Sequence, residues 1–227
     1  MRHARLAALS VSAAGVMVLT AGCGGSGGAS SGASSQASPK PTYTPPKVST
    51  FAQFPGEELK QFRGYSPDVV GLRVKGIDAM WTPEFLGTSA QPGRHYLAVY
   101  VAVTSEASDR GSQHASLENL AIRRNAKCAK PAVIDTGKYC YGTTLLFSKL
   151  VGGIPDGQWR THDWSKSELE PDSVAAGETR IGVAGFSLAD DEKGSFELCA
   201  PDKKHQALGG YEYTYPCVPI PQPTNAR

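Results

Sequence analysis

Hydrophobic and polar positions alternate with a two-residue period along most of the chain, which is the pattern of β-strands. The clearest stretch is residues 96–103, where eight apolar residues follow one another without interruption. Both faces of such a strand are apolar, so we predict a central strand that is covered on its two sides. A turn is expected just before it, at residues 91–93, which read Gln-Pro-Gly.

In two further predicted strands, the alternation of apolar and polar positions shifts by one residue at a glycine. Around Gly76, the apolar positions are Val70, Leu72 and Val74 before the glycine and Ile77, Ala79 and Trp81 after it. Around Gly185, they are Ile181 and Val183 before the glycine and Phe186 and Leu188 after it. One extra residue in a strand shifts the alternation in this way, so we predict a β-bulge at each glycine.

Phe196 and Leu198 alternate with Glu197 and predict a further strand, which follows a polar hairpin turn at residues 190–194. Weaker strands are predicted at residues 117–123, 141–147 and 210–215. Residues 55–62 favour a short helix, because a proline stands near the start and acidic residues occupy the first turn. Many short strands and few helical signals favour an all-β, antiparallel β-sandwich over an α/β fold.

The chain begins with a basic stretch at residues 1–5, followed by an apolar run at residues 6–19 and small residues directly before Cys23. These are the three parts of a secretory signal peptide. The apolar run is shorter than the roughly 20 residues that a membrane-spanning helix needs.

This start resembles the signals of bacterial lipoproteins, in which small residues precede an invariant cysteine. The resemblance implies that residues 1–22 are removed as a signal peptide and that Cys23 becomes the lipid-anchored first residue, on the extracytoplasmic face of the cell membrane. One departure is Thr20, which stands where the family prefers leucine. The alternative is an ordinary cleaved signal that leaves Cys23 as a thiol.

The segments on either side of the predicted sandwich have little to bury. Residues 23–47 are rich in Gly, Ser and Pro, so we expect a lipidated, disordered tether. Residues 48–218 then form the β-sandwich domain. Residues 219–227 are Pro-rich, and we expect an extended tail that cannot join a strand ladder.

Charge and cysteine usage fit an exported protein. Removing Arg2 and Arg5 with the signal peptide leaves 21 basic residues against 21 acidic ones, which argues against nucleic acid as a partner. Four cysteines remain besides Cys23, and they allow three disulfide connectivities. We favour Cys128–Cys140 and Cys199–Cys217, because each of these pairs closes a local loop.

Three stretches of the predicted domain carry a second resemblance: GLRVKGI at residues 71–77, GRHYLAVYVAV at residues 93–103 and AGETRIGVAGFSL at residues 176–188. They resemble the immunoglobulin-like, telokin-like domains of secreted proteins and lipoproteins of Gram-positive bacteria. The resemblance covers about two thirds of the chain and implies an immunoglobulin-like sandwich without catalytic residues. The chain departs from it by a long insertion, residues 125–172, which holds the first cysteine pair.

Candidate chemistry is sparse. We predict no cofactor and no metal site, and a Gly-x-Ser-x-Gly match at residues 24–28 lies in the tether, where the nucleophile elbow of a hydrolase would not form. His162 and Asp163 are adjacent and could form half of an acid–base pair, although a solvated loop is the favoured interpretation.

The candidate binding residues are aromatic. Three tyrosines at alternate positions of one predicted strand would share a face, and two tryptophans of the insertion could extend that row. They are Tyr211, Tyr213 and Tyr215, with Trp159 and Trp164. Packing over the core is the favoured alternative for these rings.

The sequence therefore predicts a membrane-anchored, non-catalytic binding module of the cell envelope, which recognises an envelope protein or a ligand. Two alternatives remain. One is an envelope hydrolase that acts on cell-wall glycan or peptide, and the other is a cell-wall glycan-binding module that uses the tyrosine row.

Overall fold

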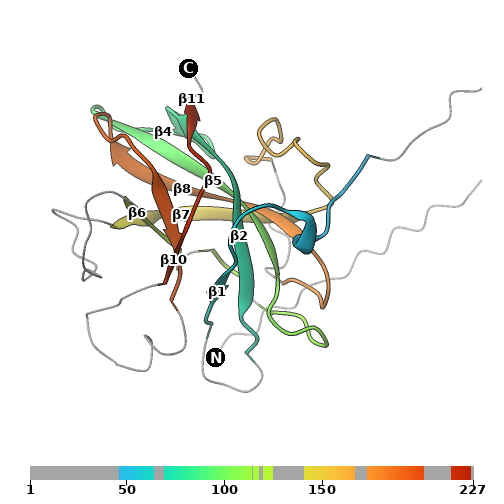
Figure 1. Ribbon diagram of the computed structural model, residues 1–227. Helices are drawn as coiled ribbons and strands as arrows, with labels where there is room; N and C mark the ends of the chain where they lie inside the picture. Colours follow the sequence, from blue (N-terminus) through green and yellow to red (C-terminus); the bar gives the residue numbers. More distant parts are fainter. Residues whose placement is uncertain are drawn as a thin grey trace, which may run out of the picture. The chain divides into compact units, whose positions relative to one another are not determined.

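The computed structural model describes residues 46–63, 69–113, 115–117, 120–124, 141–166, 173–201 and 216–225, with the backbone alone at residues 141–147 and 225. This part of the chain is almost entirely β, with one 3-10 helix, η1 (Phe51–Gln53), and no α-helix (Figure 1). Its strands are β1 (Leu59–Gln61), β2 (Leu72–Thr82), β3 (Glu84–Phe85), β4 (Thr88–Ser89), β5 (Arg94–Ser105), β6 (Ala121–Arg124), β7 (Tyr141–Gly152), β8 (Arg180–Ala189), β9 (Phe196–Cys199), β10 (Cys217–Pro219) and β11 (Thr224–Asn225). The predicted all-β, antiparallel class is confirmed.

Hydrogen bonds connect the strands in the order β1-β2-β5-β8-β7-β6-β9-β10, and β3 and β4 form a separate hairpin. These neighbours pair antiparallel, whereas β11 pairs with β2 in parallel. The long strand β7 belongs to both halves of the fold: its first residues pair with β6, and residues 148–152 pair with β8. It thereby connects the layer of β2, β5 and β8 to the layer of β6, β9 and β10.

The inner core lies between these two layers. One face of β5 supplies four side chains with no exposed surface, which are Leu97, Val99, Val101 and Val103. They belong to one apolar cluster with residues of the opposite layer, including Ile122, Phe196, Leu198 and Val218. Full burial of a side chain of this size stabilises the fold by about 1.5–3 kcal/mol, so this cluster holds the two layers together.

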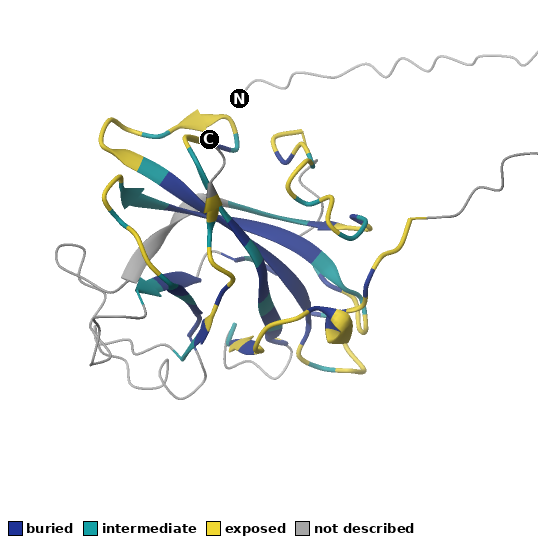
Figure 2. Ribbon diagram, turned by 45° about the horizontal axis from the view of Figure 1, so that its top comes forward, coloured by how far each residue is buried: buried dark blue, intermediate teal, exposed yellow. Residues whose placement is uncertain are grey.

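A second apolar cluster covers the other face of β5. Its centre is formed by Tyr96, Ala98, Tyr100 and Ala102, all of which are buried. Phe51 and Phe54 from the η1 segment, Phe85 from β3, and Trp164 lie on top of them. Figure 2 shows the central strands buried along most of their length, so the prediction of a strand covered on both sides is confirmed.

The two predicted bulges have different outcomes. The register between β2 and β5 shifts between Gly76 and Asp78, which confirms the first bulge; Ile77, however, belongs to the outer cluster and does not share a face with Ala79. At Gly185, β8 pairs with β5 without any shift, so the second bulge is wrong. Both faces of β8 are buried, and the apolar residues before and after Gly185 simply occupy opposite faces.

The predicted helix at residues 55–62 is wrong. Leu59 and Gln61 are buried and alternate with the exposed Lys60, so this segment forms β1 along β2. The expectation that the Pro-rich end cannot join a ladder is wrong as well. Pro219 ends β10, which lies at the edge of the sheet, where a missing N–H is tolerated. Farther on, β11 pairs with β2.

The strand predicted around Glu197 is confirmed as β9. Of the weaker strands, two are confirmed as β6 and β7, and residues 210–215 lie outside the described part of the chain. Residues 190–194 form a turn, but it leads from β8 to β9 in the other layer and does not close a hairpin. Cys199 and Cys217 lie opposite each other in β9 and β10 and form the expected disulfide.

Candidate functional site

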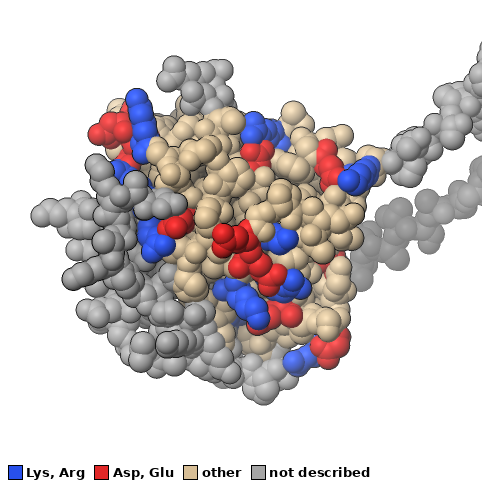
Figure 3. Space-filling model, viewed as in Figure 1, with Lys and Arg blue, Asp and Glu red and all other residues tan. Residues whose placement is uncertain are grey.

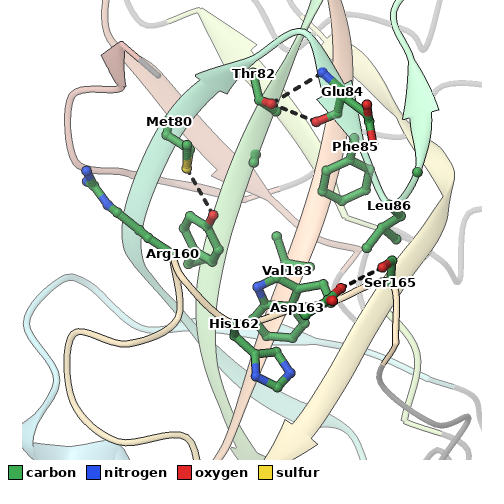
Figure 4. A pocket seen from close by; sticks show the side chains of 14 residues that line it. Met80, Thr82, Glu84, Phe85, Leu86, Arg160, His162, Asp163, Ser165 and Val183 are labelled. Carbon is green, nitrogen blue, oxygen red and sulfur yellow. Dashed lines mark hydrogen bonds between the residues drawn. The ribbon is translucent and has the colours of Figure 1, made fainter. Parts of the chain in front are cut away.

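The segment that follows β7 returns across the outer face of the sheet. Residues 153–166, which we call the 153–166 loop, lie over β5 and β8, opposite the β3–β4 hairpin. A pocket of about 250 Å³ opens between them. Its lining includes the aromatic Phe85, Tyr100 and Trp164 and the polar Arg160, His162, Asp163 and Ser165 (Figure 4).

Near its start, the 153–166 loop is held by contacts between Asp156 and the segment that precedes η1. The Asp156 carboxylate accepts hydrogen bonds from the Ser49 backbone N–H at 2.9 Å and from the Ser49 hydroxyl at 2.8 Å. Lys47 lies 3.6 Å from the same carboxylate. Gly157 has a φ of 78°, a left-handed turn conformation that suits glycine. The chain can therefore turn sharply here and run back towards β2.

Asp78, at the β2 bulge, fixes the middle of the loop. Its carboxylate forms an ion pair with Arg160 and accepts the Trp159 indole N–H at 2.9 Å. Arg160 also donates to the Thr224 hydroxyl of β11 at 2.9 Å. We call Asp78, Trp159, Arg160 and Thr224 the Asp78 clasp.

The electrostatics of the Asp78 clasp favour its charged state. Burial alone would raise the pKa of the Asp78 carboxyl, but the hydrogen bonds from Arg160, Trp159 and the Ala79 N–H outweigh burial and lower the pKa. The same pair raises the pKa of Arg160. At neutral pH the clasp is an intact ion pair that holds one wall of the pocket.

The floor of the pocket is Tyr100 of β5. Burial, the main cause, raises the pKa of its phenol to about 12, so the hydroxyl stays protonated at neutral pH. The hydroxyl lies 3.0 Å from the Met80 sulfur (Figure 4). Trp164 packs beside Tyr100, with ring centroids 6.3 Å apart, and its indole N–H donates to the Trp159 carbonyl at 2.8 Å.

The predicted pair His162 and Asp163 does lie in this pocket, together with Ser165, which the sequence reasoning missed. The Ser165 hydroxyl donates to Asp163 at 2.6 Å, and Lys166 forms an ion pair with the same carboxylate at 2.8 Å. The hydrogen bond from Lys166, followed by that from Ser165, lowers the pKa of Asp163 to about 2. Figure 4 shows the His162 ring turned away from this pair, and the ring lies edge-on against Trp164.

A second pocket, of about 360 Å³, is lined by the end of β7 and by the 153–166 loop itself. Its lining runs from Gly152 at the end of β7 to Gln158, Thr161, His162 and Asp163. His162 and Asp163 therefore line both pockets, which adjoin at these two residues.

Of the aromatic candidates, only the tryptophans fall in the described part of the chain. Trp164 is 8% exposed and Trp159 is half-buried, so both rings pack against the domain. Six other candidates lie outside the described residues, and they are Cys23, Cys128, Cys140, Tyr211, Tyr213 and Tyr215. Within the described ranges, no three His, Cys, Asp or Glu side chains come close enough together to hold a metal ion.

Charges on the face seen in Figure 3 are mixed, with blue and red side chains lying next to each other. Ion pairs on the described part of the chain include Arg73–Glu58 and Lys60–Glu106. Among the residues that the structure describes, no helix has the length and apolar character needed to cross a membrane.

Comparisons with known proteins add little. No family model matches the chain, and no curated protein matches it significantly. Among solved structures, it is similar to the crystal structure of a "putative lipoprotein", YcdA, from Bacillus subtilis subsp. subtilis str. 168, with 15% sequence identity and a TM-score of 0.38. The alignment covers 72% of this chain and 38% of that one, so the chain spans well under half of YcdA. A likeness at this TM-score defines neither fold nor function.

Proposed function

We propose that this protein is an extracytoplasmic lipoprotein, anchored to the cell membrane through Cys23, whose immunoglobulin-like domain is a non-catalytic binding module of the cell envelope. Its partners are then the membrane, through the lipid anchor, and an envelope protein or cell-wall glycan held in the pocket under the 153–166 loop. The signal-like pattern of residues 1–23 supports the anchor. The geometry of the pocket supports binding.

The observation that carries this proposal is the hydrogen bond from the Ser165 hydroxyl to Asp163. A serine becomes a nucleophile when a base such as imidazole takes its proton, but here the proton points at a carboxylate. With a pKa of about 2, Asp163 is ionised at neutral pH, so it is unsuited to act as a general acid and is a weak base for the Ser165 proton. The polar groups are paired with one another, which suits recognition better than bond cleavage.

An envelope hydrolase remains the second candidate, because His162, Asp163 and Ser165 share one pocket. In that case substrate would have to turn the His162 ring towards Ser165, since hydrogen bonds in a free active site often align only on binding. The two functions differ in their products. Binding leaves the ligand intact, whereas hydrolysis releases new glycan ends or new peptide ends.

The test incubates the purified full chain, in detergent, with an isolated cell-wall and envelope-protein fraction from which membranes have been removed, and it measures both retention and release. We expect the chain to be retained, retention to fall at least five-fold in Ser165→Ala, and no soluble fragment to appear. The exposed Ser108, outside both pockets, offers the matched control Ser108→Ala, which should be retained like the wild type. Release of fragments by the wild type, lost in His162→Ala, would establish the hydrolase instead.

A further inference from the structure

The two pockets are best considered together, because His162 and Asp163 line both of them. Sites for small molecules usually have volumes of roughly 300–1,000 Å³. At about 250 Å³ and 360 Å³, each pocket is at or near the lower limit, and both together fall well inside this range. A ligand that fills both pockets would extend over His162 and Asp163 and would match the middle of this range.

The charges of the lining favour a neutral ligand. Arg160 is neutralised by Asp78, and Asp163 is neutralised by Lys166. Glu84 lies on the exposed rim, where water screens its charge. Burying a charged ligand is costly unless the site offers an opposite charge, and the described lining places no unpaired buried charge towards either pocket.

The polar groups of the lining suit a ligand rich in hydroxyl groups. Ser165, Thr161 and Thr82 already donate their hydroxyl hydrogens within the protein, and their oxygens keep lone pairs that can accept. The Gln158 amide and the Asp163 carboxylate add further partners for hydrogen bonds. Trp164 and Tyr100 line the first pocket and give it an apolar side. Sugars combine hydroxyl groups with apolar C–H faces, and they match this mixture.

An extended peptide fits the geometry less well. One common way for an extended peptide to bind is to add a strand to an open sheet edge. On the pocket side of the sheet, the edge of β2 pairs with β1 at residues 72–74 and with β11 at residues 80–81. The first pocket lies over the face of the sheet, where the backbone N–H and C=O groups of β5 already pair with β2 and β8.

We propose that the two pockets form one groove for a neutral saccharide of at least two sugar units, which lies across His162 and Asp163. This inference rests on the proposed binding function and specifies its ligand class. The first unit occupies the pocket beside Trp164, and the second occupies the pocket beside Gln158.

The test measures dissociation constants by isothermal titration calorimetry on the purified full chain in detergent. The probes are N-acetylglucosamine, its β1-4-linked disaccharide, and the de-acetylated disaccharide, which is cationic. We expect the neutral disaccharide to bind at least ten-fold more tightly than the single sugar and than the cationic disaccharide. Equal affinity for one and two units, or preference for the cation, would overturn the inference.

Variants assign the two units to their pockets. Ser165→Ala alters the first pocket and Gln158→Ala the second, and both side chains are exposed, so the fold should persist. Each should weaken disaccharide binding about five- to ten-fold, while Ser108→Ala leaves it unchanged. Unchanged affinity in both pocket variants would also overturn the inference.

The two experiments together distinguish a wrong ligand class from a wrong proposed function. If the envelope fraction retains the chain in a Ser165-dependent manner and no neutral saccharide binds, the binding function stands and the saccharide groove is wrong. If neither the fraction nor any saccharide is bound, both proposals are wrong.

Discussion

Asp78 is the residue on which the pocket wall depends most directly. Its carboxylate, with a side chain that is 15% exposed, is held by Arg160 and by the Trp159 indole N–H. Because Asp78 belongs to β2 and both partners belong to the 153–166 loop, a change at this single position affects the loop as a whole.

We expect Asp78→Asn to lower the free energy of unfolding at pH 7 by about 1–2 kcal/mol, allowing for solvent screening of the partly exposed Arg160. The folded-state pKa of Asp78 lies below its unfolded value, so its carboxylate stabilises the fold above the unfolded pKa. That contribution is lost as the pH falls through the folded pKa. Urea unfolding at pH 7 and at pH 3 should show the difference from wild type shrinking at the lower pH.

The exposed Asp109 provides the control for this prediction, because it lies outside the Asp78 clasp. Asp109→Asn should change the free energy of unfolding by less than about 0.5 kcal/mol at either pH. A difference for Asp78→Asn that stays constant from pH 7 to pH 3 would contradict the ionic role of Asp78.

The Phe85 ring leaves no room for a side chain at position 185, which is therefore a glycine. A Cβ atom at this position would lie 2.5 Å from the Phe85 ring, which covers the outer face of β8. Gly185→Ala must displace that ring, and overpacking of this kind costs about 1–3 kcal/mol. Thermal unfolding should show the loss, and Gly152→Ala is the matched control, because a Cβ at Gly152 meets only Glu178 at 3.6 Å. Equal stabilities of the two variants would contradict this role of the Phe85 contact.

At the level of elements, the strands with the strongest alternation were predicted well. Residues 96–103 form the double-covered part of β5, and the phase change at Gly76 is a real bulge. The phase change at Gly185 has a different cause. Apolar residues lie on both faces of β8, and in the sequence this gives the same pattern as a shift in alternation. The irregularity lies in its neighbour β7, between Thr144 and Ser148. Alternation in one strand cannot show an insertion in the strand beside it.

The errors at residues 55–62 and at the Pro-rich end have a common origin. β1 and β11 are two or three residues long, and their pairing with β2 comes from tertiary contacts. Local propensity carries no information about such contacts. Residues 55–62 carry a weak helical signal, but the burial of Leu59 and Gln61 stabilises a strand there instead.

The candidate site was predicted only in part, because a pocket depends on how a loop folds back. His162 and Asp163 were identified from their adjacency, and the structure adds Ser165 and the neighbouring hairpin. Ser165 carried a local signal, since a serine two residues after an aspartate can bond its carboxylate. The contact between Asp78 and Arg160 spans 82 residues and left no local signal.

The Cys199–Cys217 disulfide joins β9 to β10, the strand at the end of the sheet order, and closes a separation of 18 residues. The double variant Cys199→Ser, Cys217→Ser should lose about 2–4 kcal/mol of unfolding free energy. Guanidinium titration of the two proteins measures the loss. A double variant is preferable to chemical reduction, because a reductant would act on the other cysteines as well. An unchanged midpoint would contradict a stabilising role of this bridge.

At the scale of the whole molecule, the proposed membrane anchoring depends on one covalent attachment, the acylation of Cys23. Cys23→Ala should abolish labelling by a radioactive fatty acid and remove the mature form from the membrane fraction, because the acyl chains supply the anchoring free energy. Cys199→Ser serves as the control, since it removes a cysteine and leaves Cys23, the proposed acylation site. A mature Cys23→Ala protein that stays in the membrane fraction would contradict lipid anchoring.

The coverage of β5 on both faces has a consequence for how the domain opens. Its backbone amides are bonded to β2 and β8, and both faces carry apolar clusters. Amides in such a strand exchange with solvent deuterium only when the whole domain unfolds, whereas those of the 153–166 loop exchange through smaller openings. Hydrogen exchange at Val99 and Val101 should therefore report the global free energy of unfolding. The β5 amides would then lose protection in Gly185→Ala by as much as the global stability falls.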